Sequence, residues 1–282
     1  MKTSPTIAGL LCASVLLFLT GCGRIAQSWY LRSYDRDISS STRDIDAARD
    51  NSQRAAAYTK RGSAYSEKAR YSRAFKLISV DECERLFGLA VKDHDQAVSL
   101  DPSSEAYYSR GVTYYDRANL DAVVNGLLVG TDAARKAWFT PAAADFKKAV
   151  ERDGRNYLAW DRLGMTHEMT GELDEAISDY SQEMALNPLG RSRLADAYCA
   201  RGGADQKQKK KDAAITDYEK SIAIGATADG CSCDPYNPLL WLYTDARQYD
   251  QGWEIIHEMQ KSKKWIQPEF LDRLKKDSGR SN

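Results

Sequence analysis

The chain has no excess of charge and very few histidines. Among its 282 residues, 40 basic residues balance 40 acidic ones, so no overall field attracts the protein to nucleic acid. The one basic run, 207–211, is flanked by aspartates and indicates a solvated loop. The histidines His94, His167 and His257 stand in no HExxH motif, and the sequence has no nucleophile elbow or phosphate-binding glycine loop. We therefore expect no nucleic-acid partner, no small-molecule substrate and no enzymatic activity.

Long apolar runs are also missing after the first two dozen residues. No later stretch is apolar enough to cross a membrane. The apolar share of 43% and the charged share of 28% suit an elongated body with much surface better than a compact enzyme with a deep core. We therefore expect a soluble body.

The first residues predict an export signal. Lys2 supplies a positive charge, and the apolar stretch 7–19 is too short to span a bilayer comfortably. It ends in Leu19-Thr20-Gly21-Cys22, which resembles the lipobox of bacterial lipoproteins. The resemblance implies removal of residues 1–21 and a diacylglycerol thioether on Cys22, with fatty acylation, for example by palmitate, of the new amino terminus. The alternative is an ordinary secretory signal with a chance cysteine.

The expected lipid would anchor the chain without a membrane-spanning helix. Each lipid methylene buried in the bilayer contributes about 0.8 kcal/mol to the free energy of membrane binding, so two or three acyl chains anchor the protein stably. Gly23 follows Cys22, where an aspartate would suggest retention in the inner membrane. We therefore expect the outer membrane, facing the periplasm, if the cell has one, and otherwise the outer face of the plasma membrane. No cofactor is expected apart from this lipid.

From about residue 44 the sequence predicts helix after helix, with no alternating strand pattern. The clearest unit covers 157–190, with a Gly171-Glu172 turn between two helices. The residues that carry its pattern are Trp160, Leu163, Gly164, Ala176, Tyr180 and Pro188. This pattern resembles the tetratricopeptide repeat of about 34 residues, although His167 and Glu183 replace the usual Tyr and Ala. The resemblance implies an all-α solenoid of helical hairpins.

About four weaker units accompany this one. We expect an anchor, linker and leading helix in residues 22–43, repeats in 44–265, and a capping helix and tail in 266–282. The first two units carry insertions, 66–89 and 118–140, and the second insertion includes the apolar run 123–129. Packing within its own hairpin is favoured for that run, with dimerisation or coverage of the groove as alternatives. In the fourth unit, Gly202-Gly203 and the lysine run 207–211 are expected to separate the two helices.

In tetratricopeptide proteins the first helix of each hairpin lines a concave face that binds a segment of a partner protein. The residues that this register places there are Thr59, Tyr108, Val112, Asp161, Arg162, Met165, Arg193, Asp196 and Trp241. Such a mixture of aromatic, apolar and charged side chains suits a protein partner. The sequence leaves open whether Met165 and Trp241 instead fill the space between neighbouring repeats.

Four cysteines remain in the expected mature chain besides Cys22. Disulfides persist beyond the cytoplasmic membrane, and the register puts Cys199 on the helix adjacent to the loop that holds Cys231 and Cys233. One hypothesis is that one of these two bridges to Cys199, and unlinked surface thiols are the alternative. A metal site is less favoured because no histidine lies nearby and Cys-x-Cys alone is a weak signal.

Two binding functions follow from the resemblance. The first is an envelope adaptor, similar to outer-membrane tetratricopeptide lipoproteins that hold peptidoglycan enzymes or their proteases. The second is an assembly factor, similar to the pilotin-like lipoproteins that escort secretin or pilus subunits. An uncharacterised envelope enzyme is a weaker alternative.

Overall fold

The computed structural model describes residues 22–120, 132–225 and 233–280 of the chain. These residues form twelve α-helices and one short 3-10 helix, and they contain no strand. The predicted all-α fold is therefore confirmed. None of the described helices combines the length and the apolar character that crossing a bilayer requires. The chain divides into two compact units, Met1–Arg152 and Asp153–Asn282.

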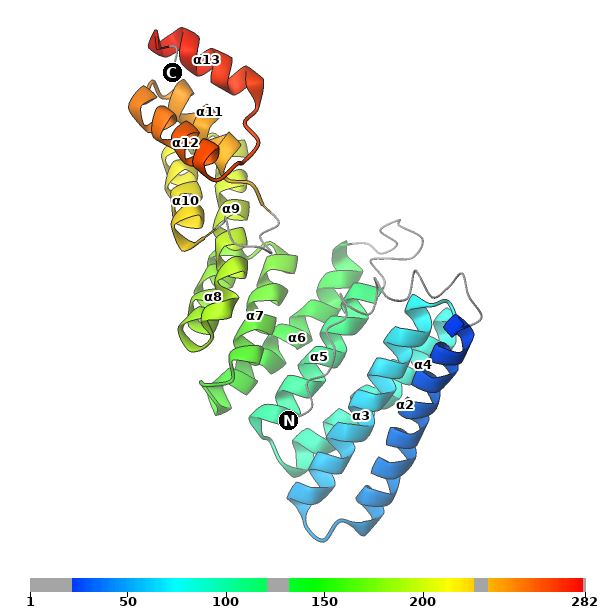
Figure 1. Cartoon of the computed structure of the whole chain (residues 1–282). Coiled ribbons are helices and arrows are strands. Elements are labelled where there is room, and N and C mark those ends of the chain that lie inside the picture. The colour runs from blue at the N-terminus through cyan, green and yellow to red at the C-terminus, as the bar shows by residue number, and fades with distance from the viewer. Residues whose placement is uncertain (1–21, 121–131, 226–232, 281–282) are drawn as a thin grey trace. The chain divides into compact units, whose positions relative to one another are not determined.

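Unit 1 consists of five helices that pack in chain order (Figure 1). Their bounds are α2 (Cys22–Ala47), α3 (Asn51–Ala74), α4 (Val80–Leu100), α5 (Ser104–Leu120) and α6 (Asp132–Arg152). The hairpins α3–α4 and α5–α6 contact each other, and α2 lies against α3. Side-chain caps start two of the helices. The Asp50 carboxylate accepts a hydrogen bond from the Gln53 N–H at 2.8 Å, and the Ser79 hydroxyl accepts one from the Glu82 N–H at 3.1 Å.

Unit 2 holds three hairpins and a terminal helix. The bounds are α7 (Tyr157–Thr170), α8 (Leu173–Leu186), α9 (Arg191–Lys207), α10 (Lys211–Ile224), α11 (Tyr236–Asp245), α12 (Tyr249–Lys261) and α13 (Pro268–Ser278), with the 3-10 helix η1 (Pro188–Gly190) before α9. The expected turn after the first of these helices is present. Gly171 ends α7 with a φ of 81°, a left-handed conformation that glycine adopts without strain. The last helix, α13, packs on α11 and α12.

In four hairpins a glycine of the first helix faces a ring of the second helix. The pairs are Gly62 with His94, Gly111 with Phe146, Gly164 with Tyr180, and Gly202 with Tyr218. A Cβ atom added to Gly164 would lie only 2.7 Å from the Tyr180 ring. Because a methyl group does not fit at that distance, glycine permits the close approach of the two helices. The hairpins α3–α4, α5–α6, α7–α8 and α9–α10 therefore share one packing pattern.

A charged pair also joins the two helices of each of these hairpins. In three hairpins it is a bidentate arginine–aspartate pair with N–O distances of 2.7 to 2.8 Å: Arg61 with Asp93, Arg110 with Asp145, and Arg201 with Asp217. The arginine directly precedes the packing glycine, and the aspartate directly precedes the ring. In α7–α8, Leu163 stands before the glycine, and the His167 Nδ1 lies 2.6 Å from the Asp179 Oδ2 instead. The repeat thus specifies a polar pair beside each apolar seam.

The two glycines of the fourth hairpin lie elsewhere than expected. Gly202 and Gly203 do not separate its helices, because both are inside α9, which continues to Lys207. For these two glycines the prediction was wrong, since a glycine within a helix also serves close packing, as Gly202 does against Tyr218. The lysine run does separate the two helices, because the turn between Lys207 and Lys211 contains Lys209, which has a φ of 62°.

The extra residues of the first two hairpins mostly lengthen helices. Within 66–89, α3 continues to Ala74 and α4 starts at Val80, so only a short turn is not helical. Within 118–140, the first residues belong to α5 and residues 132–140 belong to α6, whereas the apolar run 123–129 lies outside the described residues. The first described helix, α2, continues across the expected boundary at residue 43 as far as Ala47.

Candidate protein-binding faces

All nine predicted groove residues lie on the first helices of hairpins. In unit 1 they are Thr59 on α3, and Tyr108 and Val112 on α5; in unit 2 they are Asp161, Arg162 and Met165 on α7, Arg193 and Asp196 on α9, and Trp241 on α11. Arg193 is exposed and the other eight are half-buried. All nine therefore keep some surface, and their neighbours decide how much of it is available.

In unit 1, Tyr108 is partly engaged within its own hairpin. Its ring centroid lies 5.9 Å from that of Phe146 on α6. The side chain thus supports the α5–α6 seam, and only part of it is exposed.

In unit 2, two of the predicted groove residues bind each other. The Arg193 Nε on α9 lies 2.6 Å from the Asp161 Oδ1 on α7. Burial raises the pKa of Asp161, while the neighbouring arginines lower it. This ion pair therefore joins the α7–α8 and α9–α10 hairpins.

The departure from the family pattern at Glu183 has a structural explanation close to this ion pair. Glu183 is only 3% exposed, and a Cβ atom at Gly190 would lie 1.9 Å from its Oε2. The missing side chain at position 190 therefore makes room for the carboxylate. Burial, followed by the charge of Asp161, raises the pKa of Glu183.

Met165 and Trp241 both pack against apolar clusters. Met165 touches the cluster around Ile177 and Tyr180, and Trp241 touches the core formed by residues of α9–α13. Each fills space between helices while staying half-buried. The exposed part of Trp241 lines a hollow in unit 2.

A hollow of about 460 Å³ opens beside Trp241 in unit 2. Its lining residues are Gln206 on α9, Asp234 before α11, Asn237, Pro238 and Trp241 on α11, and Trp265, Gln267 and Phe270 from the start of α13 and the segment before it. Trp265 is 67% exposed, which is a large aromatic surface to leave in water. Apolar rings here stand beside amide and carboxylate groups, the usual composition of a site that binds an organic ligand or a side chain.

Asn237 holds the rim of this hollow in place. Its Nδ2 donates to the Asp234 Oδ2 at 2.7 Å and to the Trp265 carbonyl oxygen at 3.2 Å. Its Oδ1 accepts a hydrogen bond from the Gln267 N–H at 3.0 Å. The buried amide thus fixes the segment that carries Trp265.

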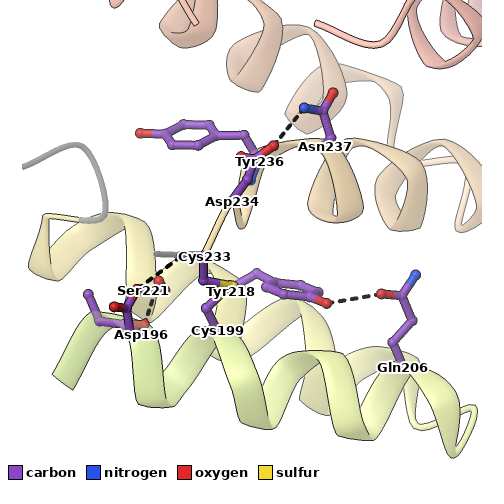
Figure 2. Close-up of a disulfide and its surroundings, with 10 residues drawn as sticks. Asp196, Cys199, Gln206, Tyr218, Ser221, Cys233, Asp234, Tyr236 and Asn237 are labelled. Atoms are coloured by element: carbon purple, nitrogen blue, oxygen red, sulfur yellow. Dashed lines mark hydrogen bonds between the residues drawn. A yellow bond between two sulfur atoms is a disulfide. The ribbon is translucent and has the colours of Figure 1, made fainter. Parts of the chain in front are cut away.

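A disulfide fastens the entry of α11 to α9. Cys199 is bonded to Cys233, with Cα atoms 6.3 Å apart, and the Cys233 N–H donates to the Asp196 Oδ1 at 3.2 Å (Figure 2). Of the two cysteines considered from the sequence, Cys233 is the one that pairs, and Cys231 lies outside the described residues. The predicted groove residue Asp196 is therefore already bonded to the segment that leads into the hollow.

Of the three histidines, His94 occupies a packing position and His167 an ion-pair position. His94 is fully buried, its two ring nitrogens have no hydrogen-bond partner, and burial lowers its pKa to about 3. The hydrogen bond to Asp179 raises the pKa of His167. In the part of the chain that the structure describes, no three His, Cys, Asp or Glu side chains gather as a metal-binding group.

Sequence reasoning missed most of the hollow because its lining comes from three separate segments. Gln206 and Phe270 belong to helices far apart in the sequence, and no periodicity relates them. The one available signal was Trp265, a large aromatic residue that follows the basic segment 261–264.

Comparison with known proteins finds a family model that matches part of unit 2. Residues 195–224, which include most of α9 and all of α10, match the family model described as a tetratricopeptide repeat. The chain contains a tetratricopeptide repeat. The match falls on the hairpin with the Gly202–Tyr218 seam, and three further hairpins share that glycine-on-ring pattern. A tetratricopeptide scaffold is suited to protein–protein interaction. No curated protein matches the chain in sequence.

Several solved structures resemble the chain at low identity. A crystal structure of MamA is 22% identical, with 66% of this chain and 95% of that chain covered and a TM-score of 0.40. PilF of Pseudomonas aeruginosa is 17% identical, with 76% and 86% covered and a TM-score of 0.38. YrrB, described as a TPR protein with an unusual peptide-binding site, is 17% identical, with 77% and 86% covered and a TM-score of 0.39.

Proposed function

We propose that the protein is a lipid-anchored scaffold of a bacterial cell envelope that binds a segment of a partner protein on its tetratricopeptide hairpins. The hollow beside Trp241 and Trp265 is the observation that carries the binding role. Three aromatic rings there can bury an apolar side chain of the partner, while Gln206 and Gln267 can bond its backbone. The proposal includes no chemical reaction.

The lipid anchor in this proposal rests on the sequence. Cys22 follows a charged residue, a short apolar stretch and the Leu-Thr-Gly tripeptide, and it is also the first residue of α2. Labelling of cells with radioactive palmitate tests the anchor. We expect label on the wild-type protein and on a Cys83→Ser control, and none on Cys22→Ser. Equal labelling of all three proteins would contradict acylation at Cys22.

Crosslinking of the protein in native membranes, followed by purification, tests the binding role. We expect one envelope protein to be enriched, and Trp265→Ala to lower its enrichment about tenfold, since truncating an aromatic hot spot costs about 1–2 kcal/mol or more. Leu189→Ala is the matched control, because Leu189 is also an exposed apolar residue of unit 2 but does not line the hollow. Equal enrichment with Trp265→Ala would contradict binding in the hollow.

The identity of the captured protein separates the two forms of this proposal. A cell-wall hydrolase or its protease supports the adaptor, whereas a secretin or pilus subunit supports the assembly factor. Wild-type protein that enriches no partner under these conditions would count against both.

A further inference from the structure

An aromatic cluster occupies the end of unit 1 where α2 begins. The Tyr30 ring lies 5.3 Å from both the Trp29 and the Tyr71 rings, and the Tyr71 ring lies 4.7 Å from that of Phe75. Tyr34 joins at 6.0 Å from Tyr71. These contacts tie the start of α2 to the end of α3, as the antiparallel arrangement of the two helices requires (Figure 1).

Exposed apolar side chains continue from this cluster across the turn between α3 and α4. Trp29 is 59% exposed, Leu77 40% and Val80 50%. They are all of the large apolar side chains that are exposed in the described part of unit 1. We call these three residues the apolar end of unit 1. Apolar groups gathered at one end of a unit, rather than scattered, indicate an interaction surface.

The distance from Cys22 indicates what this surface contacts. Trp29 lies seven positions after Cys22 on the same helix, which is about 10 Å along the helix axis. The headgroup layer of a bilayer is about 5–8 Å thick on each side of the hydrocarbon core. A lipid on Cys22 therefore holds Trp29 within reach of the membrane surface.

The chemistry of the surface also suits a membrane interface. Tryptophan and tyrosine concentrate at the headgroup level of bilayers, where a ring with one polar edge meets both phases. Arg32 and Lys76 are exposed and Arg73 is half-buried near the same end, while Asp81 and Glu82 add two opposing charges in the first turn of α4. The basic excess is small, so apolar insertion contributes more than charge to the binding.

We propose that the apolar end of unit 1 inserts into the headgroup region of a phospholipid bilayer, so that the protein contacts the membrane through folded residues as well as through its lipid. This inference rests on the proposed anchor at Cys22, because three side chains alone give weak, reversible binding. The contact would fix how unit 1 is presented above the membrane.

Flotation with vesicles of phosphatidylethanolamine and phosphatidylglycerol tests the proposal without the lipid. The protein is residues 22–282 with Cys22→Ser, which contains all of the described helices. We expect partial flotation, and an about tenfold lower bound fraction for the triple variant Trp29→Ser, Leu77→Ser and Val80→Ser. The replaced side chains are exposed, and circular dichroism checks that the variant is folded. The matched control, Leu158→Ser with Leu186→Ser and Leu189→Ser, alters three exposed apolar residues of unit 2 that do not line the hollow, and it should float as the parent does.

Three results would overturn the proposal. They are a parent protein that does not float, a triple variant that floats equally well, and a dimer that the same triple variant abolishes, which would assign the surface to a second copy of the chain. Palmitate labelling reports separately on the anchor. If palmitate labels the protein but the apolar end does not bind vesicles, the proposed function stands and only this inference is contradicted. If palmitate does not label the protein, the proposed anchor is contradicted.

Discussion

His94 illustrates how one residue can depart from a repeated pattern. It takes the place that Phe146, Tyr180 and Tyr218 take in the other hairpins, directly against the packing glycine. Unlike those rings, it buries two nitrogens that have no hydrogen-bond partner. Its neutral form is therefore the one that the fold accommodates.

We expect His94→Phe to stabilise unit 1 by about 1–3 kcal/mol, the usual penalty of an unsatisfied buried polar group. The pKa of His94 is lowered to about 3, so the folded state binds fewer protons than the unfolded state. The wild type should therefore lose stability as the pH falls from about 6.5 towards 3, and the variant should lose less. Denaturant unfolding at several pH values measures this difference. Identical pH profiles for the two proteins would contradict the assignment.

The pKa of His167 shifts in the opposite direction, since its hydrogen bond to Asp179 favours the protonated imidazole. A pKa above the unfolded value stabilises the folded protein fully below about pH 6.5, and this contribution is lost as the pH rises through the folded pKa. We expect unit 2 to weaken between mildly acidic and mildly alkaline pH. NMR titration of the imidazole measures the pKa, and His167→Gln, which does not titrate, should remove the dependence.

At the scale of the helices, the glycine seams hold the hairpins together. A Cβ at Gly164 would meet the Tyr180 ring at 2.7 Å, whereas one at Gly203, also inside a helix of unit 2, would come no closer than 3.5 Å to Tyr218. We expect Gly164→Ala to destabilise unit 2 by about 1–3 kcal/mol through overpacking. Gly203→Ala should be neutral or stabilising by up to about 1 kcal/mol, because alanine favours a helix. Chemical denaturation of both variants checks the contrast.

The disulfide between Cys199 and Cys233 also holds helices together, because it joins α9 to the segment just before α11. It closes a loop across 34 residues of sequence separation, for which the chain-entropy estimate is about 4 kcal/mol. We expect Cys233→Ser to lower the stability of unit 2 by about 2–4 kcal/mol. Reduction should destabilise the parent and leave this variant unchanged. Peptide mapping that found no Cys199–Cys233 link would contradict the pairing.

At the scale of the whole molecule, each of the two units has its own set of seams. His94→Phe and Gly164→Ala lie in different units and share no partner residue. Their effects on stability should therefore add within about 0.5 kcal/mol. Hydrogen exchange, followed by mass spectrometry, should show protection changes in α3–α4 for the first variant and in α7–α8 for the second. A change that spread equally through both units would contradict this separation.

The sequence by itself determined the helical hairpins of this protein, because their signals are local. The Gly171 turn, the helix stop near Pro188 and the small residues at helical spacing act over one or two turns of chain. The same locality explains the error at Gly202, since glycine ends one helix and packs inside another, and only the neighbouring helix distinguishes the two uses.

Only the tertiary structure decided which surfaces are available. The Asp161–Arg193 pair, the choice of Cys233 as the partner of Cys199, and the hollow beside Trp265 all join residues of different helices. Repeat register places a side chain on a face of its own helix, but it does not say what approaches that face. Which groups contact a helix face depends on the paths of the loops and on the side-chain volumes of several helices. No single stretch of sequence contains that information.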